Sequence, residues 1–364
     1  MKSSKHHRSH AGKMKVIFIK LIGGPKVTIV FFLACGLFLL LSLIEKPGDI
    51  EPTSHGYRSR LIHHRAPSIG KLKVWSLEDY PLEKRVWRPS DYETDKPSPS
   101  CQLDKLLMVI VPSTPGQLDH RTAIRNTWGT LKKVKGPVYH QTVFVIGLPS
   151  DSQERASLLE ESNKHKDVVF VNVADPYNNL SLNVQYGLYW AWTECKPSYL
   201  LKVPDDSFVN VKLLTNYLMA NDRVCSKDLY VGRTQNSKEA SRHPDKHKIA
   251  PEKATRGDFY PRYASGGGYL ISGDVLEKMV SIAPYVPLLP VEDAYVGILA
   301  HLSGVNVIDS GRFTYYSDKW QICNYLYLMV IQGVSTDVQY LCLRYSEECS
   351  DVCAEQVSGR SGWE

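Results

Sequence analysis

The sequence lacks several patterns that would assign a function directly. No two of its 8 cysteines stand at C-x-x-C spacing, and no cysteines and histidines cluster at the spacing of a zinc site. No G-x-G-x-x-G follows the first predicted strand and no Walker-type loop is present, which argues against a dinucleotide-binding or P-loop protein. Internal repeats are absent, and 24 Gly and 21 Pro in 364 residues exclude a collagen-like chain. With 43% hydrophobic residues, we expect a folded protein with a large core.

Acidic residues are missing from the N-terminus. Residues 1–26 contain seven basic residues and no acidic one, whereas the remaining chain has 37 basic and 38 acidic residues. The net charge of +6 therefore comes from the N-terminus, and the body of the protein is close to neutral. A neutral body gives no support for nucleic acid as a partner.

An uncharged apolar run follows this basic segment at residues 27–44. As a helix it would span roughly 27 Å, which is just enough to cross a bilayer. Because the basic residues precede the run, we expect a cytosolic tail at 1–26, a transmembrane signal anchor at 27–44 and a lumenal remainder. A cleaved signal peptide and a buried helix are the alternatives. The long basic segment and the lack of a small-x-small site argue against cleavage.

Residues 45–100 carry seven prolines and little periodicity, which predicts an extended lumenal stem. We expect a catalytic domain at 101–345 and a C-terminal tail at 346–364. Seven cysteines follow the apolar run, and a lumenal compartment favours disulfides between them. Their odd number leaves at least one without a partner in the chain, and their spacing does not fix the connectivity. Asn179 begins an N-glycosylation sequon, which could be glycosylated if the domain is lumenal.

Short apolar runs alternate with helical patterns after the stem. The apolar runs lie at 106–111, 142–147, 168–173 and 199–203, and the helical patterns at 118–128, 153–165 and 180–195. Asp151 and Glu154 form a capping-box pattern at the start of the second helix. The alternation predicts an α/β fold whose mainly parallel sheet is covered by helices on both faces. Ligands of such sheets bind beyond the carboxyl ends of the strands.

Two adjacent carboxylates, Asp205 and Asp206, follow the apolar strand that ends near Lys202. Carboxylates at the carboxyl end of a strand are well placed to hold Mg²⁺ or Mn²⁺ together with substrate phosphate oxygens. An Asp-Asp turn without a ligand is the alternative.

A run of three glycines, 266–268, lies between Tyr263 and Tyr269. Glycines let a backbone approach a ligand closely, and tyrosines offer flat faces for sugars. A flexible turn between two strands would produce the same pattern.

Two further pairs of charged residues stand at helical positions. Glu292 and Asp293 begin a predicted helix, where a carboxylate is suited to act as a general base or simply complements the helix dipole. Arg121 and Arg125 are four residues apart on one helical face, where they would bind a diphosphate or form a solvated basic face.

Five motifs, in this order, resemble the β1,3-glycosyltransferase family, which includes β1,3-galactosyltransferases, β1,3-N-acetylglucosaminyltransferases and, more distantly, the Fringe enzymes. They are R-x-x-I-R-x-x-W at 121–128, D-P-Y-N-N-L-S at 175–181, K-V-P-D-D-S-F-V at 202–209, Y-P-R-Y-A-S-G-G-G-Y at 260–269 and E-D-A-Y-V-G at 292–297. The resemblance covers about residues 104–335.

The resemblance implies a GT-A type nucleotide-sugar-binding fold and an inverting β1,3-transfer of a hexose. The donor would be a UDP-sugar, and the acceptor the 3-hydroxyl of a glycan on a glycoprotein or glycolipid. It also implies Mn²⁺ (or Mg²⁺) as the cofactor and a single-pass type II protein of the Golgi membrane. Galactose is favoured as the sugar. N-acetylglucosamine transfer, or a catalytically weak binding or chaperone protein on the same fold, is the alternative.

The resemblance also implies roles for single residues. Asp206 matches the metal ligand and Asp293 the catalytic base. Residues implied to bind the nucleotide sugar are Arg121, Arg125, Lys202, Asp205, Gly266, Gly267 and Gly268. Residues implied to line the acceptor or donor pocket are Tyr263, Tyr269 and Glu292. Two positions depart from the family pattern in ways that bear on metal binding: Pro204 replaces the first Asp of the metal motif, and Gln332 stands near a position that is histidine in many members.

Overall fold

The computed structural model describes residues 85–101, 107–129, 140–173, 179–225, 227–235, 260–316, 320–353 and 363. All of them belong to the second of two compact units, Ser68–Glu364. The predicted cytosolic tail, signal anchor and first part of the stem lie outside the described residues. Within the described residues, no helix has the length and apolar character needed to cross a membrane.

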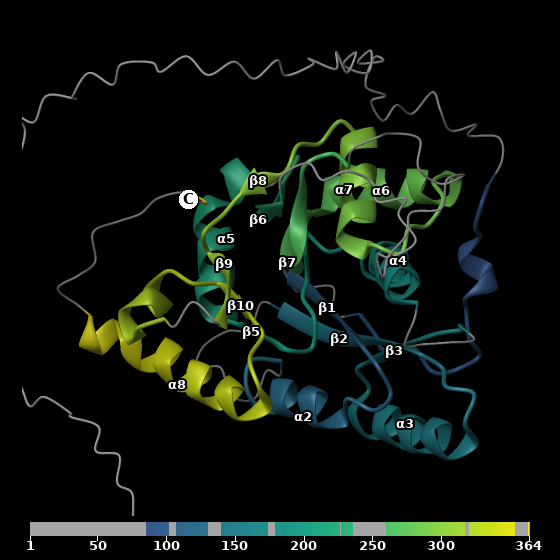
Figure 1. Cartoon of the computed structure of the whole chain (residues 1–364), viewed down its shortest axis with the longest axis horizontal. Coiled ribbons are helices and arrows are strands. Elements are labelled where there is room, and N and C mark those ends of the chain that lie inside the picture. Colours follow the sequence, from purple (N-terminus) through teal and green to yellow (C-terminus); the bar gives the residue numbers. More distant parts are fainter. Residues whose placement is uncertain are drawn as a thin grey trace, which may run out of the picture. The chain divides into compact units, whose positions relative to one another are not determined.

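The centre of the unit is a seven-stranded sheet with the order β3-β2-β1-β4-β7-β6-β8 (Figure 1). Its strands are β1 Leu107–Ser113, β2 His140–Gly147, β3 Val168–Val171, β4 Tyr199–Lys202, β6 Tyr230–Gln235, β7 Tyr263–Ser272 and β8 Ile308–Asp309. Strands β3, β2, β1 and β4 are parallel, whereas β7 runs antiparallel to both β4 and β6. The predicted α/β fold with a mainly parallel sheet is therefore confirmed.

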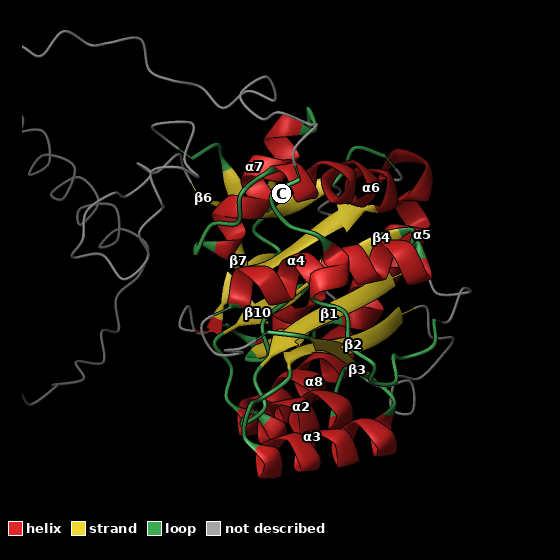
Figure 2. Ribbon diagram, turned by 90° about the vertical axis from the view of Figure 1, so that its right-hand side faces the viewer, coloured by secondary structure: helices red, strands yellow, loops and turns green. Residues whose placement is uncertain are grey.

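Helices cover both faces of this sheet, with α4, α6 and α7 on one face and α2, α3 and α8 on the other (Figure 2). Their bounds are α2 Leu118–Asn126, α3 Ser152–His165, α4 Leu180–Trp190, α5 Val211–Cys225, α6 Gly273–Ile282, α7 Glu292–Leu302 and α8 Thr336–Val352. Short helical turns are η2 Pro89–Asp91, η3 Ala191–Cys195, η4 Ala283–Tyr285 and η6 Ile322–Leu326. A second, three-stranded sheet has the order β5-β10-β9, with β5 Ser207–Val209, β9 Phe313–Tyr315 and β10 Val330–Gln332.

The apolar strands supply side chains to a hydrophobic core on each face of the sheet. In β1, Met108 and Ile110 enter the core under α4 and α7, whereas Val109 and Val111 enter the core that contains α2 and α8. Alternation of side chains along a strand thus supplies both cores from one continuous apolar run. Helix α3 begins where the capping pattern predicts, since the Asp151 side chain accepts hydrogen bonds from two backbone N–H groups of its first turn.

Residues 85–100, predicted as the end of an extended stem, pack on the domain instead. Trp87 is buried, and its Nε1 donates to the carbonyl of Ala283 at 2.7 Å. Cys101 forms a disulfide with Cys195 at the end of η3. A large indole and a covalent link hold this proline-containing segment on the domain, so the predicted stem boundary is corrected.

The predicted C-terminal tail begins inside α8, so the boundary at residue 345 is also wrong. Cys342 and Cys349, two helical turns apart, are buried free thiols on the face that α8 turns to the core. Cys353, directly after the helix, forms a disulfide with Cys323. The two disulfides in the described part of the chain agree with the expected use of cysteine.

Candidate active site

Strand β4 ends at Lys202, whose side chain joins three elements. Its Nζ donates to Oε2 of Glu292 on α7 and to the carbonyl of Gly266 on β7, both at 2.9 Å. The Tyr269 hydroxyl donates to the other oxygen of Glu292 at 2.6 Å. The side chains of Lys202 and Glu292 are only 2% and 4% exposed, so each charge compensates the other inside the protein.

These contacts correct several predicted roles. Lys202 was predicted to bind the nucleotide sugar, and Tyr263, Tyr269 and Glu292 to line a pocket, yet all four side chains are buried. Through these hydrogen bonds Lys202, Tyr269 and Glu292 fasten the first turn of α7 to the sheet. The pairing of Lys202 with a glutamate 90 positions later is a tertiary feature that the motif does not reveal.

Asp293 lies next to this buried pair, in the first turn of α7, and is half-buried. Its Oδ2 accepts a hydrogen bond from the N–H of Gly266, and its Oδ1 accepts one from the N–H of Ala294, both at 2.9 Å. Burial and the Asp293 charge raise the pKa of the neighbouring Tyr263 to about 12. A carboxylate oriented in this way is suited to accept a proton from a bound hydroxyl.

Helix α7 approaches β7 closely because residue 297 is glycine. A Cβ at Gly297 would overlap the Cβ of Tyr263. The tyrosine and the glycine of two separate motifs are therefore one packing contact, and this contact sets how far Asp293 stands from the sheet.

The three glycines lie within β7, so the alternative of a flexible turn is wrong. A Cβ at Gly266 would stand 3.4 Å from the carboxylates at the head of α7, and a Cβ at Gly267 would overlap Oε1 of Gln332 on β10. Gly268 has a φ of 152°, in the region that favours glycine. The triplet thus lets α7 and the second sheet approach β7 from opposite faces. Direct contact of these glycines with a nucleotide sugar stays a prediction.

Asp206 lies in the turn between β4 and β5, beside the end of the second sheet. Its backbone carbonyl accepts a hydrogen bond from the N–H of Val334 at 2.9 Å, and Gln332 pairs with the adjacent Ser207. Its Oδ1 is buried without a hydrogen-bond partner in the described part of the chain. Burial and the adjacent charge of Asp205 raise the pKa of Asp206.

A divalent cation would satisfy that buried oxygen, so Asp206 fits the predicted metal ligand. No group of three His, Cys, Asp or Glu side chains that could hold a metal occurs among the described residues. Mg²⁺ and Mn²⁺ commonly take one or two protein carboxylates and complete their shell with substrate phosphate oxygens.

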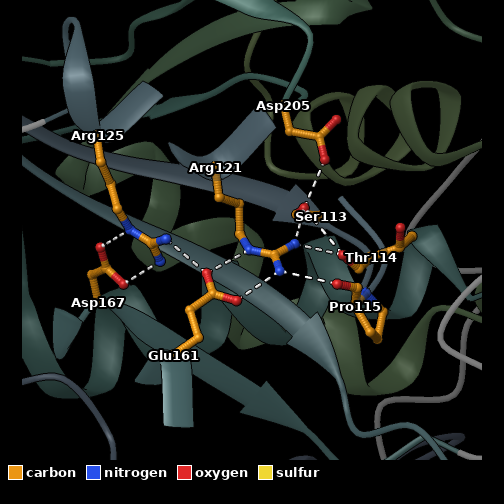
Figure 3. A network of polar contacts seen from close by, with 8 residues as sticks. All are labelled: Ser113, Thr114, Pro115, Arg121, Arg125, Glu161, Asp167 and Asp205. Carbon is orange, nitrogen blue, oxygen red and sulfur yellow. Dashed lines mark hydrogen bonds and ion pairs between the residues drawn. The ribbon is translucent and has the colours of Figure 1, made fainter. Parts of the chain in front are cut away.

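Arg121 of α2 is the centre of a buried network (Figure 3). Its five N–H groups donate at 2.5–3.0 Å to both Glu161 oxygens, to Ser113 Oγ and to the carbonyls of Thr114 and Pro115. A guanidinium has five donors, and none is left for a ligand. The predicted contact of Arg121 with the nucleotide is therefore corrected to a contact within the protein.

Arg125 is likewise 6% exposed and pairs with Glu161 and Asp167 (Figure 3). Burial by itself would raise the pKa of Glu161, but hydrogen bonds and charge from Arg121 and Arg125 outweigh it and lower that pKa. The arginines of the first motif thus lock α2 against α3, and Arg125 shows no open surface for a diphosphate. The alternative of a solvated basic face is also wrong.

Asp205 is held by both its side chain and its backbone. Its Oδ2 accepts a hydrogen bond from Ser113 Oγ at 2.6 Å, and its carbonyl lies 3.2 Å from Nδ1 of His120. Strands β1 and β4 are parallel, so their carboxyl ends meet at one edge and bring Ser113 and Asp205 together.

Sequence reasoning missed Ser113 and Glu161, although each carried a weak signal. Ser113 is a polar residue that ends an otherwise apolar strand. Glu161 stands three residues after the buried Leu158, on the same helical face.

Asn179 immediately precedes α4 and is half-buried, while the sequon residue Ser181 is buried. The preceding motif residues 175–178 lie outside the described residues. Glycosylation of Asn179 stays a prediction.

Sequence comparison decides the family. A family model described as Galactosyltransferase matches residues 119–310. This chain belongs to the galactosyltransferase family. The match includes the two aspartates after β4, the glycines of β7 and the head of α7, whereas Ser113, Gln332 and α8 lie outside it.

Relatives of this galactosyltransferase-family chain agree with the assignment. It is 30% identical over 229 residues to beta-1,3-galactosyltransferase 5 of Homo sapiens, covering 62% of this chain and 73% of the relative. It is 31% identical over 247 residues to beta-1,3-galactosyltransferase 9 of Homo sapiens, covering 67% of this chain and 65% of the relative. Among solved structures, it is similar to the galactosyltransferase LgtC with donor and acceptor sugar analogs, at a TM-score of 0.33 and 10% identity over 67% of this chain and 95% of that one. The last similarity is too low to carry any conclusion about the site.

Proposed function

We propose that this protein transfers galactose from UDP-galactose to the 3-hydroxyl of an acceptor glycan, with inversion at the anomeric carbon, on a GT-A type fold. The names of its relatives support galactose as the sugar and β1,3 as the linkage. The observation that carries the chemistry is the half-buried Asp293 carboxylate, oriented by the N–H groups of Gly266 and Ala294. The membership of the chain in the galactosyltransferase family supplies the reaction in which such a base is needed.

Asp293 takes the proton of the acceptor hydroxyl as that oxygen attacks the anomeric carbon. The new carbon–oxygen bond forms on the face opposite the bond to the diphosphate, which breaks and leaves its electron pair on UDP. One displacement needs a single base, in contrast to the pair of carboxylates that a two-step retaining reaction uses.

Asp206 would hold Mn²⁺ or Mg²⁺ through its buried oxygen, with diphosphate oxygens of the donor as further ligands. When bound, the cation neutralises negative charge on the departing diphosphate. The side chain of Asp205, fixed by Ser113, is free to face the ribose or the donor sugar with its other oxygen.

The expected localisation is the Golgi membrane, as a type II protein with residues 1–26 in the cytosol and residues 27–44 as the anchor. The two disulfides Cys101–Cys195 and Cys323–Cys353 support an oxidising lumen for the domain. The acceptor would then be a glycan on a lumenal glycoprotein or glycolipid.

The test is release of UDP by the full chain, produced in a secretory host and purified in detergent. UDP-galactose, UDP-N-acetylglucosamine and UDP-N-acetylgalactosamine are offered with a pool of acceptor sugars, with Mn²⁺ or with EDTA. We expect release from UDP-galactose that EDTA abolishes. No release from any donor would contradict the enzyme and favour a binding protein on the same fold.

Asp293→Asn is expected to reduce transfer by at least about 100-fold, because general-base catalysis contributes about 10²–10⁴-fold. Asp337→Asn is the matched control, since Asp337 also lies in the first turn of a helix, α8, but is exposed. Normal transfer by Asp293→Asn would refute the assignment of the base.

A further inference from the structure

The two adjacent aspartates after β4 are held in different ways. Asp206 Oδ1 has no hydrogen-bond partner in the described part of the chain, whereas Asp205 Oδ2 accepts the hydroxyl proton of Ser113 at 2.6 Å. Figure 3 shows the second oxygen of Asp205 pointing away from Ser113. One carboxylate therefore has a buried oxygen without a partner, and the other is oriented by the protein before any ligand arrives.

The hydroxyl of Ser113 accepts one hydrogen bond and donates another. The guanidinium can only donate, and its Nη1 donates to Ser113 Oγ at 2.9 Å. Of the two acceptors within reach of the single Ser113 hydroxyl proton, the Asp205 carboxylate at 2.6 Å is far closer than the Thr114 carbonyl at 3.5 Å, so the hydroxyl donates to Asp205. A series of charge-assisted hydrogen bonds thus runs from Arg121 through Ser113 to Asp205.

Arg121, where this series of hydrogen bonds begins, cannot move independently of the core. Arg121 is fully buried, Glu161 accepts hydrogen bonds from its Nε and Nη2 at 2.8 Å, and the carbonyls of Thr114 and Pro115 accept two further N–H groups. Because β1, α2 and α3 each contribute a member, the position of the Ser113 hydroxyl is set by the packing of three elements.

We propose that Ser113 is a positioning residue for the donor, and that Arg121 and Glu161 act through it to hold Asp205 in the orientation that binds the nucleotide sugar. This inference rests on the proposed function, since it requires a donor at Asp205. It also gives the buried arginine of the first motif a role in donor binding that needs no contact with the nucleotide.

The test is a double-mutant cycle on the full chain, with the dissociation constant for UDP-galactose measured by calorimetry in Mn²⁺. We expect Ser113→Ala to raise this constant about tenfold, because it removes one hydrogen bond to a charged group. Ser113→Thr, which keeps a hydroxyl, should stay within about threefold of the wild type. In an Asp205→Asn background, Ser113→Ala should weaken binding no further, since both changes break the same series of hydrogen bonds.

Ser272→Ala is the matched control. Ser272 is also a buried serine at the carboxyl end of a strand, and its hydroxyl donates to Asp274 at 2.6 Å. Strand β7 is antiparallel to β4, so this pair lies at the opposite edge of the sheet. We expect Ser272→Ala to leave the UDP-galactose dissociation constant unchanged, whatever it does to thermal stability.

Two outcomes separate this inference from the proposed function. A wild type that transfers galactose, with penalties of Ser113→Ala and Asp205→Asn that simply add, would overturn the inference alone. A wild type that neither binds UDP-galactose nor transfers galactose would overturn both. If Ser113→Ala does not fold, Ser113→Cys replaces it in the cycle, because a thiol of similar size is only a weak donor.

Discussion

Replacing Glu292 by glutamine tests how much the negative charge of the buried pair that fastens α7 to the sheet contributes to stability. Glu292→Gln keeps an amide oxygen for the Tyr269 hydroxyl but leaves the Lys202 ammonium, 2% exposed, without its counter-charge. Breaking a buried ion pair from one side costs about 3–5 kcal/mol, because an uncompensated charge stays in the interior. We expect the free energy of unfolding in urea to fall by about this amount.

An exposed pair provides the control for this measurement. Lys278 pairs with Asp228 at the surface, where the two side chains are 43% and 69% exposed, so Asp228→Asn should cost less than about 1 kcal/mol. If Glu292→Gln also costs less than about 1 kcal/mol, the reasoning that Lys202 and Glu292 form a desolvated pair is refuted.

A double variant separates stability from positioning. Lys202→Met with Glu292→Leu removes both charges, and apolar replacement of a buried pair is often neutral or stabilising. Stability should therefore recover in part, since the buried Tyr269 hydroxyl still loses its acceptor. Transfer activity should stay low, because the Gly266 carbonyl has lost its Lys202 donor and the backbone that orients Asp293 is no longer held.

Three further predictions concern other parts of the fold. Gly297→Ala should cost about 1–3 kcal/mol of stability and reduce transfer, since the new methyl group pushes α7 away from Tyr263; equal activity of variant and wild type would contradict this. The pKa of Glu161 is lowered from its usual value of 4.5, so its ionised form stabilises the folded protein at pH values above 4.5. This stabilisation is lost as the pH falls from 4.5 through the lowered pKa. In urea unfolding at several pH values, Glu161→Gln should lack this part of the loss of stability in acid. Cys353→Ser removes a disulfide that closes a separation of 30 residues and should cost about 3–4 kcal/mol, whereas a melting temperature equal to that of the wild type would show that the bond does not constrain α8.

The order and the type of the main elements could be predicted from the sequence. Apolar runs at 106–111 and 199–203 are strands β1 and β4, and the helical pattern at 153–165 is α3 with its Asp151 cap. These features are local, since a strand buried on both faces needs a continuous apolar run and a helix needs a cap and a period of 3.6 residues. The resemblance of five ordered motifs likewise sufficed for the family.

What each motif residue does was decided by the tertiary structure. Arg121 was predicted to bind a diphosphate and Lys202 to bind the nucleotide sugar, because a sequence shows the charge of a residue but not its partner. Their partners, Glu161 and Glu292, stand 40 and 90 positions away and come from other elements. The sequence by itself determined the strands, the helices and the pair of aspartates at the edge of the sheet. Only the packing of α2, α3 and α7 decided which charges are buried in pairs.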